Sequence, residues 1–359
     1  MEKENTVLGH TIPSRKRPIV IIGAGGIVND AHLPAYGKAG FKAVSIVDLN
    51  LEKAKEIAQR FSIPNVYDDI KKCIAEAPEN AVYDVALPAS ALKNVLPLIP
   101  KKSGVLIQKP FGSDHSDAKS LLEICKSNEL IAAVNFQMRT LSLIKKAKEI
   151  IAEGLIGEIH DIDTRITVNT PWELWDFLKT APRLEILYHS IHYIDCIRSF
   201  WGDPMGVYGK TVVHPKTADF APTRSTIILD YDGMRRATVT TNHGHIYGDA
   251  YEESNFKIEG SKGAIRIVMG LNLNYPEGKA DRFELCRVDE NGKSLGWKDV
   301  AVEGTWFPDA FIGTMANLQC HLEDASIPLA ASVADAERTM ACVEAAYTSS
   351  AQGGVPLPE

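Results

Sequence analysis

The segment EILYHSIHYID, which begins at Glu185, crowds acid, base and metal-binding side chains into one short stretch. Helical spacing from Glu185 places Tyr188, His189 and His192 near one face, with Asp195 one further step along. Such a face can bind a metal, move protons or simply be polar. Each interpretation requires different residues elsewhere in the chain.

A metal enzyme is one alternative. Glu185, His189 and His192 form the pattern E-x-x-x-H-x-x-H, whose spacing could hold zinc or manganese. No other motif in the sequence completes such a site, so the favoured interpretation contains no metal. The chemistry of this face then depends on a cofactor bound by another part of the chain.

A glycine-rich turn early in the chain predicts that cofactor. The apolar run PIVII leads into Gly23 and Gly25, and the chain continues as a plausible helix, NDAHLPAYGKAG. The first glycine permits a tight turn, the second lets the backbone approach a pyrophosphate, and the helix N-terminus offers amides to its charge. Val28 stands where a third glycine is usual. Asp48 ends the next predicted strand, where a carboxylate binds ribose hydroxyls and repels a 2'-phosphate, so we expect NAD rather than NADP.

Strands and helices alternate through the first part of the chain. After the first apolar run, strands are predicted over residues 42–48, 82–88 and 104–110, and helices over residues 49–61 and 116–128. This order is typical of an α/β fold in which a parallel sheet is covered on both faces. The sequence therefore predicts a doubly wound Rossmann domain that carries the glycine turn.

Beyond about residue 157 the pattern changes to long alternating stretches. The predicted strands there cover residues 158–169, 225–233, 235–245, 255–270 and 283–294. They imply an α+β domain with a large, mostly antiparallel open sheet and the helix EILYHSIHYIDCIRSF packed on it. The tail ASVADAERTMACVEAAYTSSAQGG is helical in period. Because helices on one face leave the other face open, we expect a homo-oligomer formed through this sheet.

Composition limits the classes of function. A chain of 359 residues exceeds what one hydrophobic core usually supports, so two domains are expected. A net charge of -7 and the lack of a basic stripe argue against nucleic acid, and no apolar run is long enough to span a membrane. Six scattered cysteines without a C-x-x-C pair fit a reducing, cytoplasmic location.

Five stretches together resemble the Gfo/Idh/MocA family, the glucose-fructose oxidoreductase and inositol dehydrogenase group. They are GAGGIVNDAHLPAY, LPASALKNVLPLIPKKSGVLIQKPFG, IIAEGLIGEI, HYIDCIRSFWGDP and VEAAYTSSAQGGVPLP. In that order, they are similar to five features of the family. These are the nucleotide loop, the stretch ending in an E-K-P signature, the entry to the second domain, the H-x-x-D helix, and the C-terminal helix with the last strand. The resemblance implies a nicotinamide cofactor and a sugar or polyol substrate oxidised at a ring carbon.

The resemblance assigns the central roles to Lys109 and His192. Lys109 matches the signature lysine, which implies a place beside the nicotinamide and the reacting hydroxyl, where an ammonium stabilises alkoxide charge. His192 matches the family histidine that takes the hydroxyl proton. Asp195 would orient the ring. The chain departs from the family at Gln108, which replaces the signature glutamate, and at Tyr188, where an aspartate is common.

Aromatic and polar residues before the helix are candidates for sugar binding. Trp172 and Trp175 could cover a pyranose face, while Asp176 and Arg183 could bind hydroxyls. Packing of both tryptophans in a loop is the competing interpretation. Together with the resemblance this predicts a neutral sugar or glycoside, with C3 of a glucose-type ring favoured, and leaves a non-catalytic NAD-binding regulator as an alternative.

The predicted site residues form three overlapping groups. The catalytic group is Lys109, His192, Tyr188 and Asp195; the cofactor group is Gly23, Gly25, Gly26, Ile27, Asp48, Pro88, Gln108 and Lys109; and the substrate group is Lys109, Trp172, Trp175, Asp176, Arg183, His189 and His192. The predicted boundaries are a flexible arm over residues 1–17, a Rossmann domain over 18–137, an α+β domain over 138–340, and a helix and tail over 341–359 returning toward the first domain.

Overall fold

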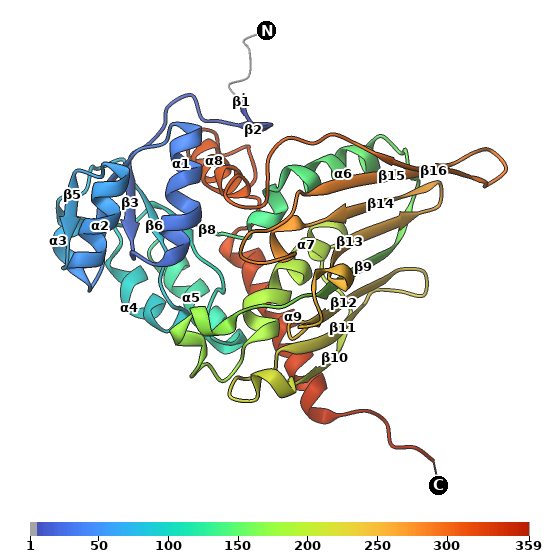
Figure 1. Ribbon diagram of the computed structural model, residues 1–359. Coiled ribbons are helices and arrows are strands. Elements are labelled where there is room, and N and C mark those ends of the chain that lie inside the picture. Colours follow the sequence, from blue (N-terminus) through green and yellow to red (C-terminus); the bar gives the residue numbers. More distant parts are fainter. Residues whose placement is uncertain (1–5, 359) are drawn as a thin grey trace. The chain divides into compact units, whose positions relative to one another are not determined.

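The computed structural model describes residues 6–358, and Figure 1 shows its helices and strands along the chain. The chain divides into two compact units. The first contains the residues up to Ser142 together with Glu303–Met340, and the second contains Leu143–Val302 together with the residues from Ala341 onward.

The first unit is built on a six-stranded sheet in the order β5-β4-β3-β6-β7-β8. Every neighbouring pair of strands in it is parallel. The strands are β3 (Ile19–Ile22), β4 (Ala43–Val47), β5 (Asn65–Tyr67), β6 (Val82–Val85), β7 (Gly104–Ile107) and β8 (Ile131–Val134). The central strands are buried along their whole length, as in a sheet covered on both faces. The predicted Rossmann-type sheet is confirmed.

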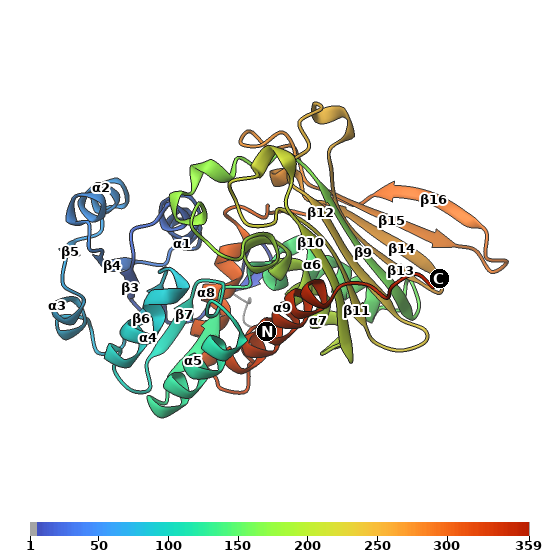
Figure 2. The ribbon, with the colours of Figure 1, turned by 90° about the horizontal axis from the view of Figure 1, so that it is seen from below.

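Helices cover both faces of this sheet. They are α1 (Leu33–Ala39), α2 (Leu51–Phe61), α3 (Ile70–Ala75), α4 (Leu92–Val95) and α5 (His115–Ser127). Side chains of α1 and α2 share one buried cluster with β3, and Figure 2 shows α4 and α5 on the opposite side of the sheet. Asn50, Asp69 and Asp114 begin α2, α3 and α5 by accepting hydrogen bonds from backbone amides of the first turn.

A helix from late in the sequence completes this unit. In α8 (Ala310–Glu323), Phe311, Ile312 and Met315 join the same buried cluster as β3 and α1. The sequence placed this stretch in the second domain, because a single amphipathic helix carries no sign of which sheet it will cover. The structure corrects that boundary.

The N-terminal arm is also ordered where the structure describes it. The strands β1 (Thr6–Val7) and β2 (His10–Thr11) pair in antiparallel fashion, and Ile12 enters the buried cluster. The backbone amide of Ser14 donates to Glu323 at the end of α8 over 2.8 Å. The described part of the arm therefore contacts α8 and the buried cluster. The first five residues of the predicted arm lie outside the described range.

The second unit contains an eight-stranded sheet in the order β10-β11-β12-β9-β13-β14-β15-β16. All neighbours are antiparallel except β9 and β12, which are parallel. The strands are β9 (Ile159–Thr167), β10 (Gly206–Val212), β11 (Arg224–Asp230), β12 (Arg236–Asn242), β13 (Glu253–Gly260), β14 (Gly263–Val268), β15 (Arg282–Val288) and β16 (Ser294–Asp299). The predicted mostly antiparallel sheet is confirmed.

One face of this sheet carries helices. They are α6 (Ser142–Ala152), α7 (Ile191–Trp201) and the C-terminal part of α9 (Val333–Gln352), which Figure 2 shows on the same side. Gly209 on β10 admits α9 closely, since a β-carbon there would lie 2.5 Å from the carbonyl oxygen of Ala346. Tyr208 and Ile228, which are cross-strand partners, are exposed. Self-association through this sheet stays a prediction.

The end of the chain differs from the expected last strand. Residues 353–358, after α9, form no regular secondary structure and are exposed. The final part of α9, from Ala341, belongs to the second unit. The return of this segment toward the first domain stays a prediction. Within the described residues, no helix combines the length and the apolar character needed to cross a membrane.

Candidate functional site

The carboxyl ends of the parallel strands bring the predicted cofactor residues to one edge of the first unit. Gly23 follows β3, Asp48 follows β4, Pro88 lies just beyond β6, and Gln108 and Lys109 follow β7. The strands β3 and β6 are neighbours, and the strand order runs outward from them in both directions. Ligands of doubly wound sheets bind at this edge, where the strand order reverses.

Gly23 makes the turn at this edge. Its φ is +106°, and a β-carbon would lie 2.4 Å from the carbonyl oxygen of Ala86, so a side chain would have to displace the backbone. A β-carbon at Gly25 would meet no described atom within 4 Å. The carbonyl oxygen of Gly25 accepts from the amide of Val28 over 3.1 Å, which starts the helix directly after the glycines. The backbone is thus open on one side, as a bound pyrophosphate requires.

Two helical N-termini lie next to these turns. Ile27 is the N-cap of a π-helical turn, η1 (Val28–His32), which continues into α1, and Pro88 is the N-cap of a short 3-10 turn at Ala89–Ala91. Gly26 lies between the glycine turn and η1. Amides that precede the first internal hydrogen bond of a helix can bind a phosphate oxygen. The amides of Val28 and Asn29 are already used, because both donate to the carbonyl oxygen of Gly25.

Asp48 is held rigidly by backbone amides. Its Oδ2 accepts from the amide of Ala24 over 2.7 Å and its Oδ1 from that of Asn50 over 2.8 Å. The carboxylate therefore links the glycine turn to the start of α2. Each carboxylate oxygen can accept more than one hydrogen bond, so capacity remains for hydroxyl donors.

Gln108 and Lys109 follow β7 with their backbone fixed. The amide of Gln108 donates to the carbonyl oxygen of Val85 over 2.9 Å, and its own side-chain oxygen accepts from the amide of Lys109 over 3.1 Å. Gln108 is buried and Lys109 is half-buried. Burial lowers the pKa of Lys109 to about 8, because desolvation disfavours the ammonium. Lys109 is therefore a cation that can lose its charge near physiological pH.

In the second unit, the helix that carries His192 begins with a wide turn. Residues Ile186–Ser190 form a π-helical turn, η7, which continues directly into α7. A π turn brings together positions five residues apart, and Ser190 Oγ accordingly donates to Glu185 Oε1 over 2.6 Å. His192 is almost fully buried and Asp195 is fully buried. The predicted helix is confirmed, but its first turn does not have α-helical spacing.

This wide turn changes which side chains could bind a metal together, compared with the group that the sequence suggested. The carboxylate of Glu185 and the imidazoles of His189 and His243 have ligating atoms that all lie within 4.8 Å of one another. His192 is not a member of this group. Since one extra residue enters the turn after Glu185, the position seven residues on no longer falls on the same face. His243 follows β12, and a lone histidine after a strand gives no sequence signal of its distant partner.

Tyr188 lies on the same turn with a different environment. Its ring packs against Phe177, with 5.7 Å between the ring centroids. Burial raises the pKa of Tyr188, so the phenol keeps its proton and can donate a hydrogen bond at neutral pH.

The two tryptophans of the preceding loop occupy different positions. Trp172 is 4% exposed and forms a small core with Leu178 and Leu184. Trp175 is half-buried, with its ring centroid 6.2 Å from that of Trp172 and 6.3 Å from that of Tyr275. Trp172 is therefore a packing residue, whereas part of the Trp175 indole is accessible for a ligand.

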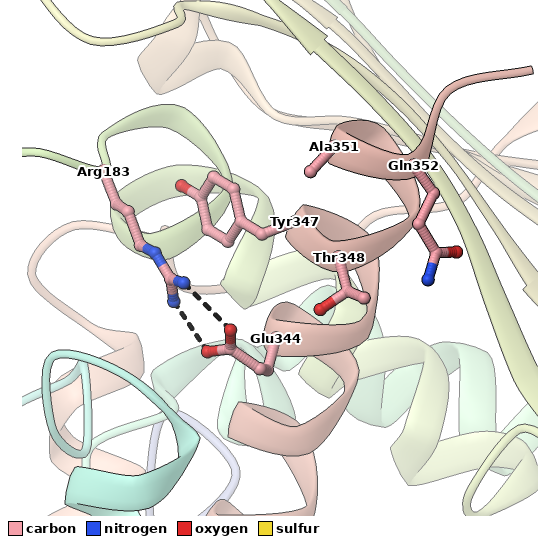
Figure 3. Close-up of a pocket in the computed structure, with 6 residues that line it drawn as sticks. All are labelled: Arg183, Glu344, Tyr347, Thr348, Ala351 and Gln352. Carbon is pink, nitrogen blue, oxygen red and sulfur yellow. Dashed lines mark hydrogen bonds and ion pairs between the residues drawn. The ribbon is translucent and has the colours of Figure 1, made fainter.

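The two charged candidates near this loop already have partners. Asp176 is exposed and pairs with Lys179 over 2.8 Å. Arg183 makes a bidentate ion pair with Glu344 on α9, over 2.6 and 2.9 Å, and its guanidinium lies 4.7 Å from the ring centroid of Tyr347. Figure 3 shows this ion pair with the neighbouring side chains of Tyr347, Thr348, Ala351 and Gln352. Together these residues line a recess of about 380 Å³. A substrate hydroxyl would have to compete with Glu344 for Arg183.

The chain is similar to several sugar dehydrogenases. It is 25% identical over 345 residues to D-apiose dehydrogenase of Rhizobium rhizogenes, covering 93% of this chain and 95% of that protein. It is 23% identical over 261 residues to the NADP(+)-linked D-xylose 1-dehydrogenase of Haloarcula marismortui, covering 69% and 71%. The solved structure of a levoglucosan dehydrogenase with NADH and levoglucosan has a TM-score of 0.78 at 18% identity, covering 94% of this chain and 98% of that one.

Two family descriptions match successive parts of the sequence. Residues 17–136 match the oxidoreductase family with an NAD-binding Rossmann fold, and residues 144–266 match the GFO/IDH/MocA C-terminal domain. The first range contains the glycine turn and Lys109, and the second contains His192. The chain belongs to the Gfo/Idh/MocA family of oxidoreductases.

Proposed function

We propose that the protein oxidises a secondary hydroxyl on the ring of a neutral sugar, polyol or glycoside, with NAD as the hydride acceptor. The observation that carries the proposal is the assembly of Gly23, Asp48 and Lys109 at the carboxyl edge of one parallel sheet. The names of the relatives support the substrate class, since apiose, xylose and levoglucosan are all carbohydrates.

The residues at this edge fit a dinucleotide. The open backbone at Gly25 suits a pyrophosphate, and the carboxylate of Asp48 suits the adenosine ribose. A 2'-phosphate would face the charge of Asp48, which supports NAD over NADP. When bound, the nicotinamide accepts the hydride, and the protein supplies orientation and electrostatics.

Two side chains divide the remaining chemistry. Loss of hydride from a carbinol requires that its oxygen lose a proton, and the ammonium of Lys109 stabilises the negative charge that then develops. The imidazole of His192 accepts that proton, because its ordinary pKa lies near neutrality. Asp195, one turn further along α7, positions the His192 ring. Tyr188, as a neutral phenol, donates a hydrogen bond to a substrate hydroxyl.

The substrate we favour is a glucose-type ring oxidised at C3, with the aglycone of a glycoside projecting outward. Trp175 offers an accessible apolar face for such a ring, and Asp176 a carboxylate for its hydroxyls. A ketone at C3 acidifies the neighbouring C–H bond. The product would therefore be ready for an elimination that releases the aglycone.

A substrate screen tests the proposal directly. Free sugars, inositols, sugar acids and aryl glucosides are incubated with the protein and NAD, and NADH formation is followed by absorbance. The product is reduced with borodeuteride, and the position of deuterium is located by NMR. We expect turnover of a glucoside with deuterium at C3. Turnover of sugar acids or inositols alone would contradict the glycoside assignment while leaving the dehydrogenase assignment intact.

Replacing Asp48 with serine should weaken NAD and improve NADP. Loss of hydrogen bonds to a charged acceptor typically costs about 1.5–3 kcal/mol, so KM for NAD should rise by about 10- to 100-fold. KM for NADP should fall, because the repulsive charge is gone. Steady-state kinetics with both cofactors measure the switch. The exposed neighbour Asp68, changed to serine, is the matched control and should alter neither value. An unchanged preference in the Asp48 variant would remove this residue from the cofactor site.

The activity should also decline at alkaline pH. Since the pKa of Lys109 is about 8, its ammonium is present below that pH and is lost above it. We expect kcat/KM, which reports the free enzyme, to fall as the pH rises through about 8. In Lys109→Arg the guanidinium stays charged, so this decline should move to higher pH whatever the absolute rate. Identical alkaline limbs in the two proteins would show that Lys109 is not the group that titrates.

A further inference from the structure

Three polar side chains meet inside the second unit in a way that the dehydrogenase chemistry does not use. Glu185 and His189 lie on the π-helical turn η7, and His243 lies just after β12. Glu185 and His243 are fully buried, whereas the side chain of His189 is 16% exposed. The segments that carry them are far apart in sequence, so the fold itself assembles the group.

The distances within this group are too long for strong hydrogen bonds. Glu185 Oε1 lies 3.8 Å from Nδ1 of His189 and 3.5 Å from Nε2 of His243, whereas charge-assisted hydrogen bonds are about 2.7–2.9 Å long. His243 Nε2 is buried and has no hydrogen-bond partner among the described residues. An imidazole nitrogen that is buried in this way next to a carboxylate needs a partner that the side chains do not supply.

Hydroxyl groups hold two members of the group from outside. Thr170 Oγ1 lies 2.8 Å from the other ring nitrogen of His243, Nδ1, and Ser190 Oγ donates to Glu185 over 2.6 Å. A hydrogen bond to the far nitrogen fixes which nitrogen of an imidazole is available, as in protein sites where histidine binds a metal. In this arrangement Nε2 of His243 is available toward Glu185.

The charge of Glu185 also needs compensation. Its side chain is fully buried, and Ser190 Oγ donates to its Oε1 over 2.6 Å. Its other oxygen, Oε2, is buried without a hydrogen-bond partner among the described residues. The ion-pair partners found for it among the described residues are imidazoles, which are cationic only when protonated. A buried anion of this kind is stabilised by a cation placed among its neighbours.

We propose that Glu185, His189 and His243 bind a divalent transition metal ion, with Zn²⁺ as the best match. Two imidazoles and one carboxylate are a borderline donor set that prefers zinc to calcium or magnesium, and three protein ligands leave a fourth position for water or a substrate oxygen. The partly exposed His189 is the member nearest to solvent. The site does not depend on the roles of Lys109 and His192.

Metal binding is tested without any assay of turnover. The purified protein is stripped with a chelator, desalted and titrated with Co²⁺, whose visible absorption bands report tetrahedral coordination, and Zn²⁺ is then added in competition. We expect one Co²⁺ per chain, with the bands lost on stoichiometric Zn²⁺. A stripped protein that binds NAD normally but gives no Co²⁺ bands at stoichiometric metal would overturn the proposal.

Variants locate the ligands. His243→Ala and Glu185→Gln should each weaken Zn²⁺ by at least about 100-fold, since even removal of a supporting outer group costs 10- to 100-fold. His245→Ala, two residues along the same segment, is the matched control and should bind as the wild type. If the buried variants fail to fold, His189→Gln replaces a partly exposed ligand. Wild-type affinity for Zn²⁺ in the folded His189 and His243 variants would contradict the assignment of these residues as ligands.

Discussion

Replacing Lys109 with methionine should lower kcat by about two to three orders of magnitude, the loss typical when one donor to a developing oxyanion is removed. Methionine keeps a long, unbranched side chain but carries no charge. The variant should therefore fold and bind NAD while failing to stabilise the alkoxide. The measurements are kcat on the substrate found by the screen, Kd for NAD, and the thermal midpoint.

A surface lysine provides the comparison for this variant. Lys101 is exposed in the turn before β7, and Lys101→Met should leave kcat unchanged. Wild-type turnover in Lys109→Met would remove the lysine from the chemistry. A variant that has lost NAD binding as well as turnover would assign Lys109 to the cofactor site instead of to the reacting hydroxyl.

Replacing His192 with alanine should lower kcat by about two to four orders of magnitude, the contribution typical of a general base. His192 is almost fully buried, so His192→Gln, which keeps more of the side-chain volume, separates lost chemistry from lost packing. Both variants should retain NAD.

Tyr188→Phe is the comparison for the His192 variants, because it removes a hydrogen-bond donor to the substrate and leaves the general base in place. Removal of one neutral hydroxyl that donates to the substrate should raise KM by about 3- to 10-fold, in line with about 1 kcal/mol for a neutral hydrogen bond. Full activity in His192→Gln would contradict the assignment of the base. If the wild type bound NAD but oxidised none of the sugars, the alternative of a non-catalytic NAD-binding regulator would be favoured.

The meeting of the predicted cofactor residues at one edge of the sheet could be inferred from sequence because its determinants are local. The turn at Gly23 requires a positive φ, and Asp48 sits at the end of the very next strand, so strand order alone brings both to one edge. The parallel and antiparallel sheets were predictable for a similar reason, since the period of buried residues differs between them. Both predictions depend only on residues that are close together in the sequence.

The group around Glu185 was not predictable because it depends on contacts between distant segments. Regular helical spacing points from Glu185 to His192, but the π turn shifts the register, and His243 comes from a strand end some 50 residues away. Likewise, nothing local in α8 shows that it covers the parallel sheet, and nothing local in residues 6–17 shows that they rest on α8. Each error came from a tertiary contact that overrides a local pattern.

On the ribosome, the order of synthesis leaves the first unit incomplete for most of translation. All six strands of its sheet have been made once β8 is finished, yet α8 emerges only after the entire eight-stranded sheet has followed it. Until then the apolar surface that receives Phe311, Ile312 and Met315 has no cover. The nascent chain therefore presents an unprotected hydrophobic face during that interval, the kind of surface that chaperones bind and that aggregates when they are scarce.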